Sequence, residues 1–249
     1  MQKLMSQLRR LYLPVGAPAQ ELLEQRLLGN ATDLVKLSTE AGLARAVVIA
    51  FNKVPDGEDT QHWDLLCTTA NALQNELGLP APAVSISAAD GYGLWLSLEE
   101  PARPEQLQTL VELLRSVYFP DTASIAAGPS DLVELPPCLH PRSGKWSAFI
   151  HPGLGASFAD EPGLDMAPPL AGQNALLEGL HSISEAQLTH AIAVLRQAHG
   201  EVGAVSRQQD ASAPRQDGLL LADATLDDIV RHLHAKNIEP TFRHLIGNK

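Results

Sequence analysis

Four side chains that can bind phosphate lie close together in the segment from Leu135 to Trp146. They are His140, Arg142, Ser143 and Lys145. Charge-assisted hydrogen bonds from such groups can hold a phosphate or the backbone of a nucleic acid. The same segment, with Pro141 and Gly144 inside it, is equally typical of a polar β-turn between two strands. Both interpretations, a phosphate-binding loop and an ordinary turn, stay open.

Other groups of reactive side chains are less informative. Asp56, Glu58 and Asp59 form an acidic cluster that could recruit a cation, but a solvated turn that favours the start of the next helix explains it more simply. The glycines near residue 155 are not followed by the Gly-Lys-Ser/Thr of a phosphate-binding loop. The two cysteines cannot form a four-cysteine zinc site. No catalytic constellation can be proposed from the histidine spacing.

Composition indicates a globular protein with an acidic surface. The chain has 249 residues, 45% of them hydrophobic, and a formal net charge of -11. That charge argues against a protein that coats duplex DNA, because phosphate binding needs clustered Lys and Arg, although it leaves room for a local basic groove. Residues 1–10 lack the apolar run of a signal peptide, and no stretch approaches the ~20 apolar residues of a membrane span. We therefore expect a cytoplasmic protein with no membrane partner.

The hydrophobic pattern predicts an α+β fold. Residues 46–51 are a continuous apolar run, which is typical of a strand buried on both faces. Thr60 can begin an amphipathic helix that ends at Gly78. Residues 83–98 read as a β-hairpin, and Pro104 lies near the start of the next helix.

The rest of the chain is predicted to add short elements to this core. A capping box, Ser184-x-x-Gln187, opens a late helix. Further elements are expected at 33–42 (helix), 132–135 and 146–150 (strands) and 173–180 (helix). Residues 1–200 would form the main domain. Residues 201–217, which are polar and aperiodic, would form a linker or long loop, and residues 218–249 a small C-terminal helical segment.

Three stretches resemble the archaeo-eukaryotic primase superfamily, also called primase-polymerases. They are the strand ending at Asn52, the hairpin from Ser87 to Trp95, and the His-Pro-Arg-Ser-Gly run from His140. Their order and spacing are similar to those of the small primase subunit and of the polymerase domain of bacterial end-joining ligases. The resemblance covers roughly residues 40 to 180 and implies a central mixed sheet flanked by helices.

The resemblance also implies that this chain has lost its metal ligands. In the family the first strand ends in two acidic residues one apart, which face the same side and hold two divalent ions. The matching positions here are Ala50, which cannot coordinate a metal, and Asn52, which offers one neutral oxygen. In the hairpin Ser87 fits the family pattern, but Gly93 stands at the position of a phosphate-contacting His, and Asp90 stands where the family often has a basic residue.

The third stretch keeps the family pattern best, with Arg for Lys and Ser for Thr. The resemblance therefore implies nucleotide or nucleic-acid binding by Ser87 and by the four side chains of that stretch, and no catalytic residue. Asp121 lies near the place of a third family acid. Asp121, Asp56 and Asp59 are the remaining candidates for relocated metal ligands.

We expect a degenerate primase-like protein that needs no cofactor. Its partner would be a nucleotide, a single-stranded nucleic acid, or a protein of DNA replication or repair. One alternative is an active primase or polymerase that uses Mg or Mn held by relocated ligands, because phosphoryl transfer depends on charge neutralisation by metal. Another is a protein-interaction scaffold that has kept only the fold.

Overall fold

A computed structural model describes residues 1–16, 18–53, 60–119 and 131–211, with side chains as far as residue 200. The chain divides into two units, Met1–Ala204 and Val205–Lys249, and the first contains the sheets. The three candidate acids Asp56, Asp59 and Asp121 lie outside the described residues, as do residues 212–249. Among the described residues, no helix has both the length and the apolar character needed to cross a membrane.

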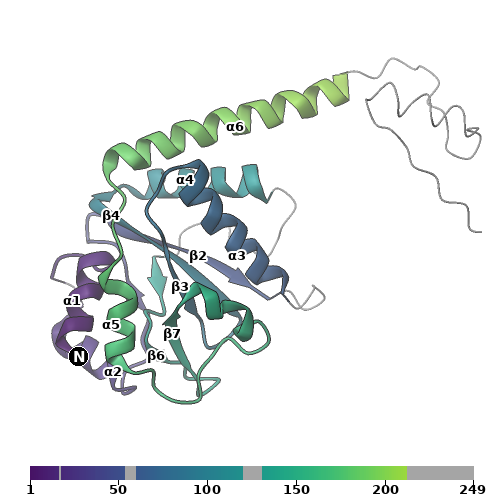
Figure 1. Cartoon of the computed structure of the whole chain (residues 1–249). Coiled ribbons are helices and arrows are strands. Elements are labelled where there is room, and N and C mark those ends of the chain that lie inside the picture. Colours follow the sequence, from purple (N-terminus) through teal and green to yellow (C-terminus); the bar gives the residue numbers. More distant parts are fainter. Residues whose placement is uncertain (17, 54–59, 120–130, 212–249) are drawn as a thin grey trace, which may run out of the picture. The chain divides into compact units, whose positions relative to one another are not determined.

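Five strands form the central sheet, in the order β2-β4-β3-β7-β6 (Figure 1). Their bounds are β2 Ala44–Asn52, β3 Ala83–Ile86, β4 Gly91–Ala102, β6 Cys138–Leu139 and β7 Trp146–Ile150. The α+β class is as predicted, but every pairing between these strands is antiparallel. The expected mixed sheet was therefore wrong. The physical reason is that β2 and β3, which run in the same direction, both pair with β4, so β4 separates them.

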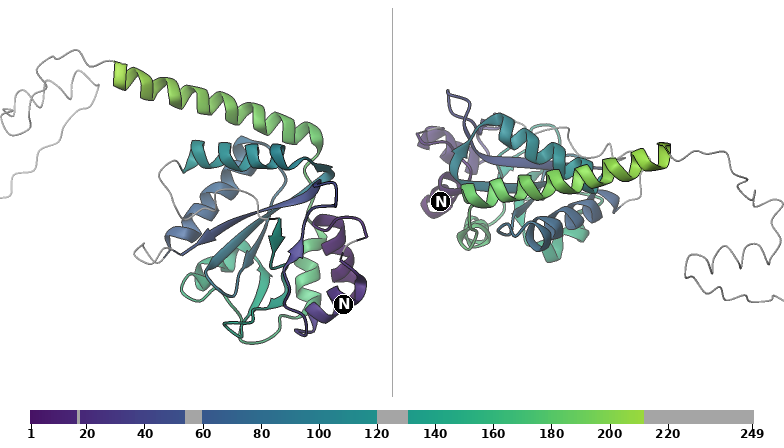
Figure 2. Two further views of the ribbon diagram at one scale, coloured as in Figure 1. Left: turned by 180° about the vertical axis from the view of Figure 1, so that it is seen from behind. Right: turned by 90° about the horizontal axis from the view of Figure 1, so that it is seen from above.

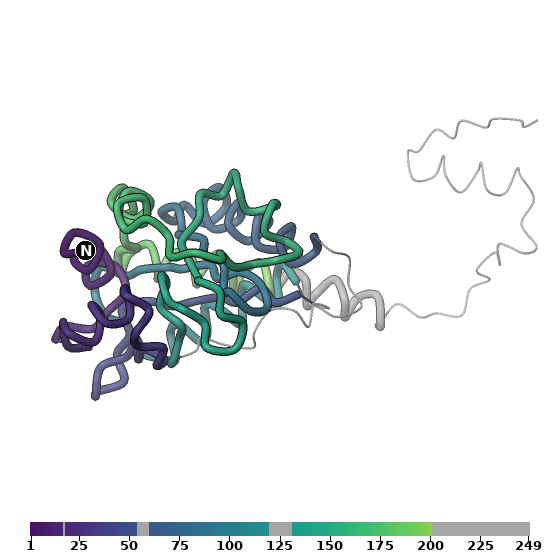
Figure 3. The backbone as a smooth tube through the Cα atoms, turned by 90° about the horizontal axis from the view of Figure 1, so that it is seen from below, coloured from purple at the N-terminus to yellow at the C-terminus, as the bar shows by residue number. Residues whose placement is uncertain are grey.

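Helices cover both faces of the sheet (Figures 1 and 2). One face carries α3 (Gln61–Asn71), its π-helical continuation η1 (Ala72–Glu76), α4 (Pro104–Tyr118) and the start of α6 (Glu185–Ala211). The other carries α1 (Gln2–Leu11), α2 (Gln20–Leu27) and α5 (Leu170–Glu178). Helices α1 and α5 are distant in sequence but lie side by side (Figure 3). Arg10 of α1 donates hydrogen bonds to the carbonyls of Leu177 and Leu180, each at 3.0 Å.

The two-residue period of β2 divides its side chains between two hydrophobic cores. Val47, Ile49 and Phe51 enter the core under α3, α4 and α6. Ala46 and Val48 face the core on the side of α1, α2 and α5, since alternate strand residues point to opposite faces. On that second side the rings of Tyr12, Trp95 and Phe149 pack together, with centroids 5.1 to 5.8 Å apart.

Several predicted boundaries are confirmed. Thr60 precedes α3, Pro104 is the first residue of α4, and β3 and β4 form the expected hairpin. The capping box is also present: Ser184 Oγ accepts from the Gln187 amide at 3.2 Å, and Gln187 Oε1 accepts from the Ser184 amide at 3.0 Å.

Two predicted segments differ from the structure. The helix expected over 33–42 is wrong, because this segment contains β1 (Val35–Lys36), which pairs with β5 (Leu132–Val133) in a separate two-stranded sheet. Residues 201–211 continue α6 where a linker was expected. A helix that is already nucleated adds residues at little cost, so the missing hydrophobic period did not mark its end.

Candidate functional site

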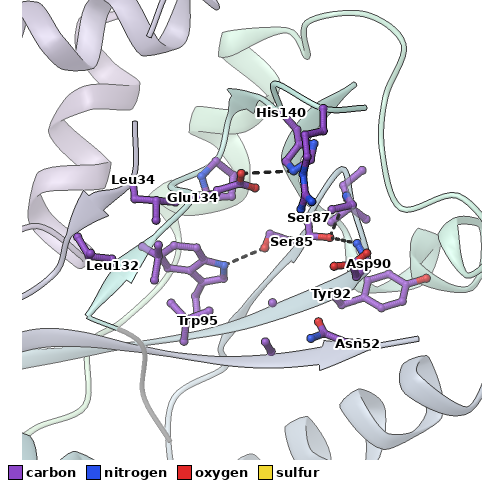
Figure 4. A pocket seen from close by; sticks show the side chains of 18 residues that line it. Leu34, Asn52, Ser85, Ser87, Asp90, Tyr92, Trp95, Leu132, Glu134 and His140 are labelled. Atoms are coloured by element: carbon purple, nitrogen blue, oxygen red, sulfur yellow. Dashed lines mark hydrogen bonds and ion pairs between the residues drawn. The ribbon is translucent and has the colours of Figure 1, made fainter. Parts of the chain in front are cut away.

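A cavity of about 340 Å³ opens on the sheet face that carries Ala50 and Asn52 (Figure 4). It lies between the sheet, the β1–β5 ribbon and the turn that joins β6 to β7. Residues of all three stretches line it: Ala50 and Asn52, Ser87 and Gly93, His140 and Arg142. The structure therefore brings together six of the positions that the sequence indicated.

Strand register explains why these positions meet. Ala50 pairs with Gly93 and Asn52 with Gly91, across β2 and β4. Val48, two residues earlier on the same face, is partly buried against the core beside α1 and α2 and also lines the cavity. The cavity begins where that core ends, so the last residues of β2 on this face point into it.

Position 93 has little room for a side chain. A Cβ there would lie 2.9 Å from Ser85 Oγ and 3.0 Å from Trp95 Nε1. These two groups are joined, because the Trp95 indole donates a hydrogen bond to Ser85 Oγ at 2.8 Å. An imidazole at position 93 would require both of them to move, so the floor of the cavity is built around a glycine.

The β3–β4 loop is held by hydrogen bonds within it and from two other segments. Ser87 Oγ accepts from the amides of Ala89, Asp90 and Gly91 at 3.0 to 3.2 Å. Ala88, which has a positive φ of 61°, donates its N–H to the Pro162 carbonyl at 2.6 Å. Its own carbonyl accepts from Ser143 Oγ at 2.7 Å. Ser87 is thus mainly a loop-forming residue whose hydroxyl hydrogen remains to be donated.

The His140–Lys145 segment forms a turn between β6 and β7, as the plainer of the two interpretations predicted. His140 is buried, and its Nδ1 accepts from the Ser143 amide at 3.1 Å. Its Nε2 lies 3.7 Å from a Glu134 carboxylate oxygen. Within this turn, His140 and Arg142 reach the cavity, whereas Ser143 and Lys145 do not line it.

Lys145 is engaged outside the cavity. Its ammonium group forms ion pairs with Glu161 and with Asp165, the latter at 3.2 Å. The hydrogen bond to Glu161 is the main cause that raises the pKa of Lys145. Among the described residues that line the cavity, Arg142 is the one whose side chain carries a permanent positive charge.

Two carboxylates and two leucines also line the cavity. Asp90 and Glu134 both face the cavity. Burial raises the pKa of Glu134, while the nearby His140, Arg26 and Arg142 lower it. Leu34 and Leu132 line the cavity with 52% and 53% of their surface exposed. Sequence reasoning missed Leu34, Leu132 and Glu134, because only the β1–β5 pairing brings them to the site.

The described residues do not form a metal centre at this place. Nowhere in the described part of the chain do three His, Cys, Asp or Glu side chains group as metal ligands would. At the end of β2, Ala50 and Asn52 together offer one neutral amide oxygen. The proposals for Asp56, Asp59 and Asp121 stay untested, because those residues are not described.

Comparisons with known solved structures include a weak likeness of fold. No family model and no curated protein matches the chain. Among solved structures, the AEP domain of the primase-polymerase (PrimPol) of cyanophage S-2L is similar, with a TM-score of 0.34 and 13% sequence identity. The match covers 64% of this chain and 77% of that one. The family of the chain therefore stays a proposal.

Proposed function

We propose that this chain is a primase-like protein that binds a nucleotide or single-stranded nucleic acid without catalysing nucleotidyl transfer. One observation carries the proposal. The three stretches that resemble the superfamily line a single cavity, and the positions that would hold metal ions there are Ala50 and Asn52. A binding function needs the cavity alone, whereas the chemistry needs two metal ions as well.

Arg142 is the side chain best suited to a phosphate of the ligand. It is exposed, lines the cavity and carries a charge at any relevant pH. Asn52 and the Ser87 hydroxyl can add neutral hydrogen bonds. This set is enough for one phosphate and too small to neutralise a triphosphate in a transition state.

Binding is tested by titrating single-stranded oligonucleotides and nucleotides into the protein at low salt, with Arg142→Ala beside wild type. A hydrogen bond to a charged group contributes about 1.5–3 kcal/mol, so we expect Arg142→Ala to weaken oligonucleotide binding roughly ten- to a hundredfold. Arg196→Ala, an exposed arginine on α6 and on the other face of the sheet, is the matched control and should bind as wild type does. Equal binding by the two variants would contradict the role of Arg142.

The absence of catalysis is tested separately. Primer synthesis and primer extension are measured with Mg and with Mn over long incubations. We expect no product from wild type. Metal-dependent synthesis would instead establish the active-enzyme alternative. No binding of any nucleotide or oligonucleotide, together with co-purification of a protein, would favour the scaffold alternative.

A further inference from the structure

The charges that line the cavity are unfavourable for a triphosphate. Asp90 and Glu134 face the same space as Arg142, so the lining has two carboxyl groups and one guanidinium, with His140 Nε2 lying 3.7 Å from Glu134. The other cations of these segments are held elsewhere: Lys145 by Glu161 and Asp165, and Lys53 by Asp160 at 3.2 Å. Like charges repel each other, and water screens this repulsion less at the half-buried Glu134 than at the exposed Asp90.

The apolar lining suits a flat ring. Ala50 and Gly93 are paired across the floor and carry little or no side chain. Leu34 and Leu132 stand at one side of the cavity with about half of their surface exposed, and a ligand that covered them would gain hydrophobic contact (Figure 4). Pockets of a few hundred Å³ with an apolar lining and a few fixed polar groups are typical of small-molecule sites.

The polar groups on the other side of the cavity match the edge of a base. The Asn52 carboxamide has both a donor and an acceptor, as the edge of a nucleobase does. The Ser85 and Ser87 hydroxyls accept hydrogen bonds from Trp95 and from the loop amides, so each keeps its hydrogen to donate. Unpaired bases are commonly recognised in this way, by an apolar contact on the face and hydrogen bonds on the edge.

From these three features we infer that the cavity selects a nucleobase and rejects a polyphosphate. This inference rests on the proposed function and specifies its ligand: an unphosphorylated nucleoside, or a base exposed in a single strand, is preferred to a nucleoside triphosphate. Asp90 and Glu134 set the preference by repulsion, and Leu132 and Leu34 hold the ring.

The first test is calorimetric titration of each nucleoside and its triphosphate at low salt, with EDTA present. We expect the nucleoside to bind roughly tenfold more tightly than the triphosphate. In the double variant Asp90→Asn, Glu134→Gln the ratio of the two affinities should shift most of that factor toward the triphosphate. Glu21→Gln, a surface acid in α2, should change neither affinity.

The second test examines the apolar wall. Leu132→Ala should weaken nucleoside binding several-fold, because it removes a surface that the ring would cover. Leu154→Ala removes a leucine of similar exposure, 59%, which does not line the cavity, and should leave binding unchanged. Equal effects of the two substitutions would overturn the assignment of the ring to this wall.

Oligonucleotides distinguish the two sources of the base. If the natural ligand is a strand, a single-stranded oligonucleotide should bind more tightly than an abasic oligonucleotide of the same length and more tightly than the free nucleoside. If it is a free nucleoside, the strand should bind no better. In both cases the measured affinity should depend on the presence of the base.

The outcomes also separate this inference from the proposed function. A triphosphate that binds wild type as tightly as its nucleoside, or an abasic strand that binds as well as the intact one, overturns base selection and leaves nucleotide or strand binding standing. Failure of all these ligands to bind overturns both.

Discussion

Ala50 and Asn52 are the residues on which the chemical interpretation depends. They lie two apart on β2, face the same cavity, and pair with the glycines at 93 and 91. Carboxylates at these two positions would therefore converge on one space, as the strand period predicts. Two carboxylates that converge in this way could share a divalent ion.

We accordingly predict that Ala50→Asp with Asn52→Asp creates a divalent-ion site. Manganese at saturating concentration should stabilise the double variant by about 1–3 kcal/mol, because it binds the folded state only. Thermal unfolding with and without manganese measures this, and the single variant Asn52→Asp, with one carboxylate, is the control. Equal stabilisation of wild type would show that the cavity still holds metal without these acids.

The sequence predicted some members of this site and could not predict others. The places of Ser87, His140 and Arg142 follow from motif spacing, since a hairpin and a turn keep their residues near one another. Ser143 and Lys145 had equally suitable side chains, but their partners, Ala88, Glu161 and Asp165, come from other segments. Such contacts depend on tertiary packing, and no local pattern contains them.

At the scale of elements, the hairpin joining β3 and β4 positions the loop beside the cavity. Its Gly91 faces the end of β2 so closely that an added Cβ would lie 2.1 Å from the Phe51 carbonyl oxygen. Backbone atoms of a paired strand cannot move aside as a flexible side chain can. A glycine is therefore required where β4 begins.

We predict that Gly91→Ala destabilises the fold by about 1–3 kcal/mol, the usual cost of overpacking a core. Gly172→Ala, in α5, is the matched control: an added Cβ meets nothing within 4 Å. That control should be neutral or stabilising by about 0.5–1 kcal/mol, because alanine favours the helix. Urea denaturation of both variants decides the matter, and equal stabilities would argue against the close approach.

Elements with strong local signals were predicted well, and those that depend on distant pairing were not. Thr60, Pro104 and the Ser184 capping box mark helix starts through their own hydrogen bonds and backbone geometry. The segment from Asp33 to Gly42 has a capping residue as well, yet Val35 and Lys36 pair with Val133 and Leu132, nearly a hundred positions away. Sheet partners at such separations override local propensity.

At the scale of the whole molecule, a sheet with a core on each face buries several aromatic side chains. Tyr12 is 1% exposed and packs against Trp95 and Phe149. Burial raises the pKa of Tyr12 far above its usual value. The folded state thus keeps the phenolic proton at a pH where the unfolded chain, with a tyrosine pKa of about 10, loses it.

The sign of the pH dependence follows. Below about pH 10, the contribution of Tyr12 to the free energy of unfolding should not depend on pH. Above that pH, the free energy of unfolding should fall by up to about 1.4 kcal/mol per pH unit, because the unfolded chain loses the tyrosine proton and the folded protein keeps it. We predict a smaller fall in Tyr12→Phe. Denaturation at neutral and at alkaline pH measures both slopes. Identical slopes in the variant and wild type would mean that Tyr12 ionises in the folded protein.

Ala88, in the loop beside the cavity, is held by two hydrogen bonds to other segments of the chain. Its amide donates a hydrogen bond to the Pro162 carbonyl, and its carbonyl accepts one from Ser143 Oγ. The loop next to the cavity is therefore held in place without a ligand. Binding of a ligand would then cost little free energy for ordering this wall of the cavity. If the cavity binds a small ligand as proposed, this wall should favour ligands that fit its existing shape.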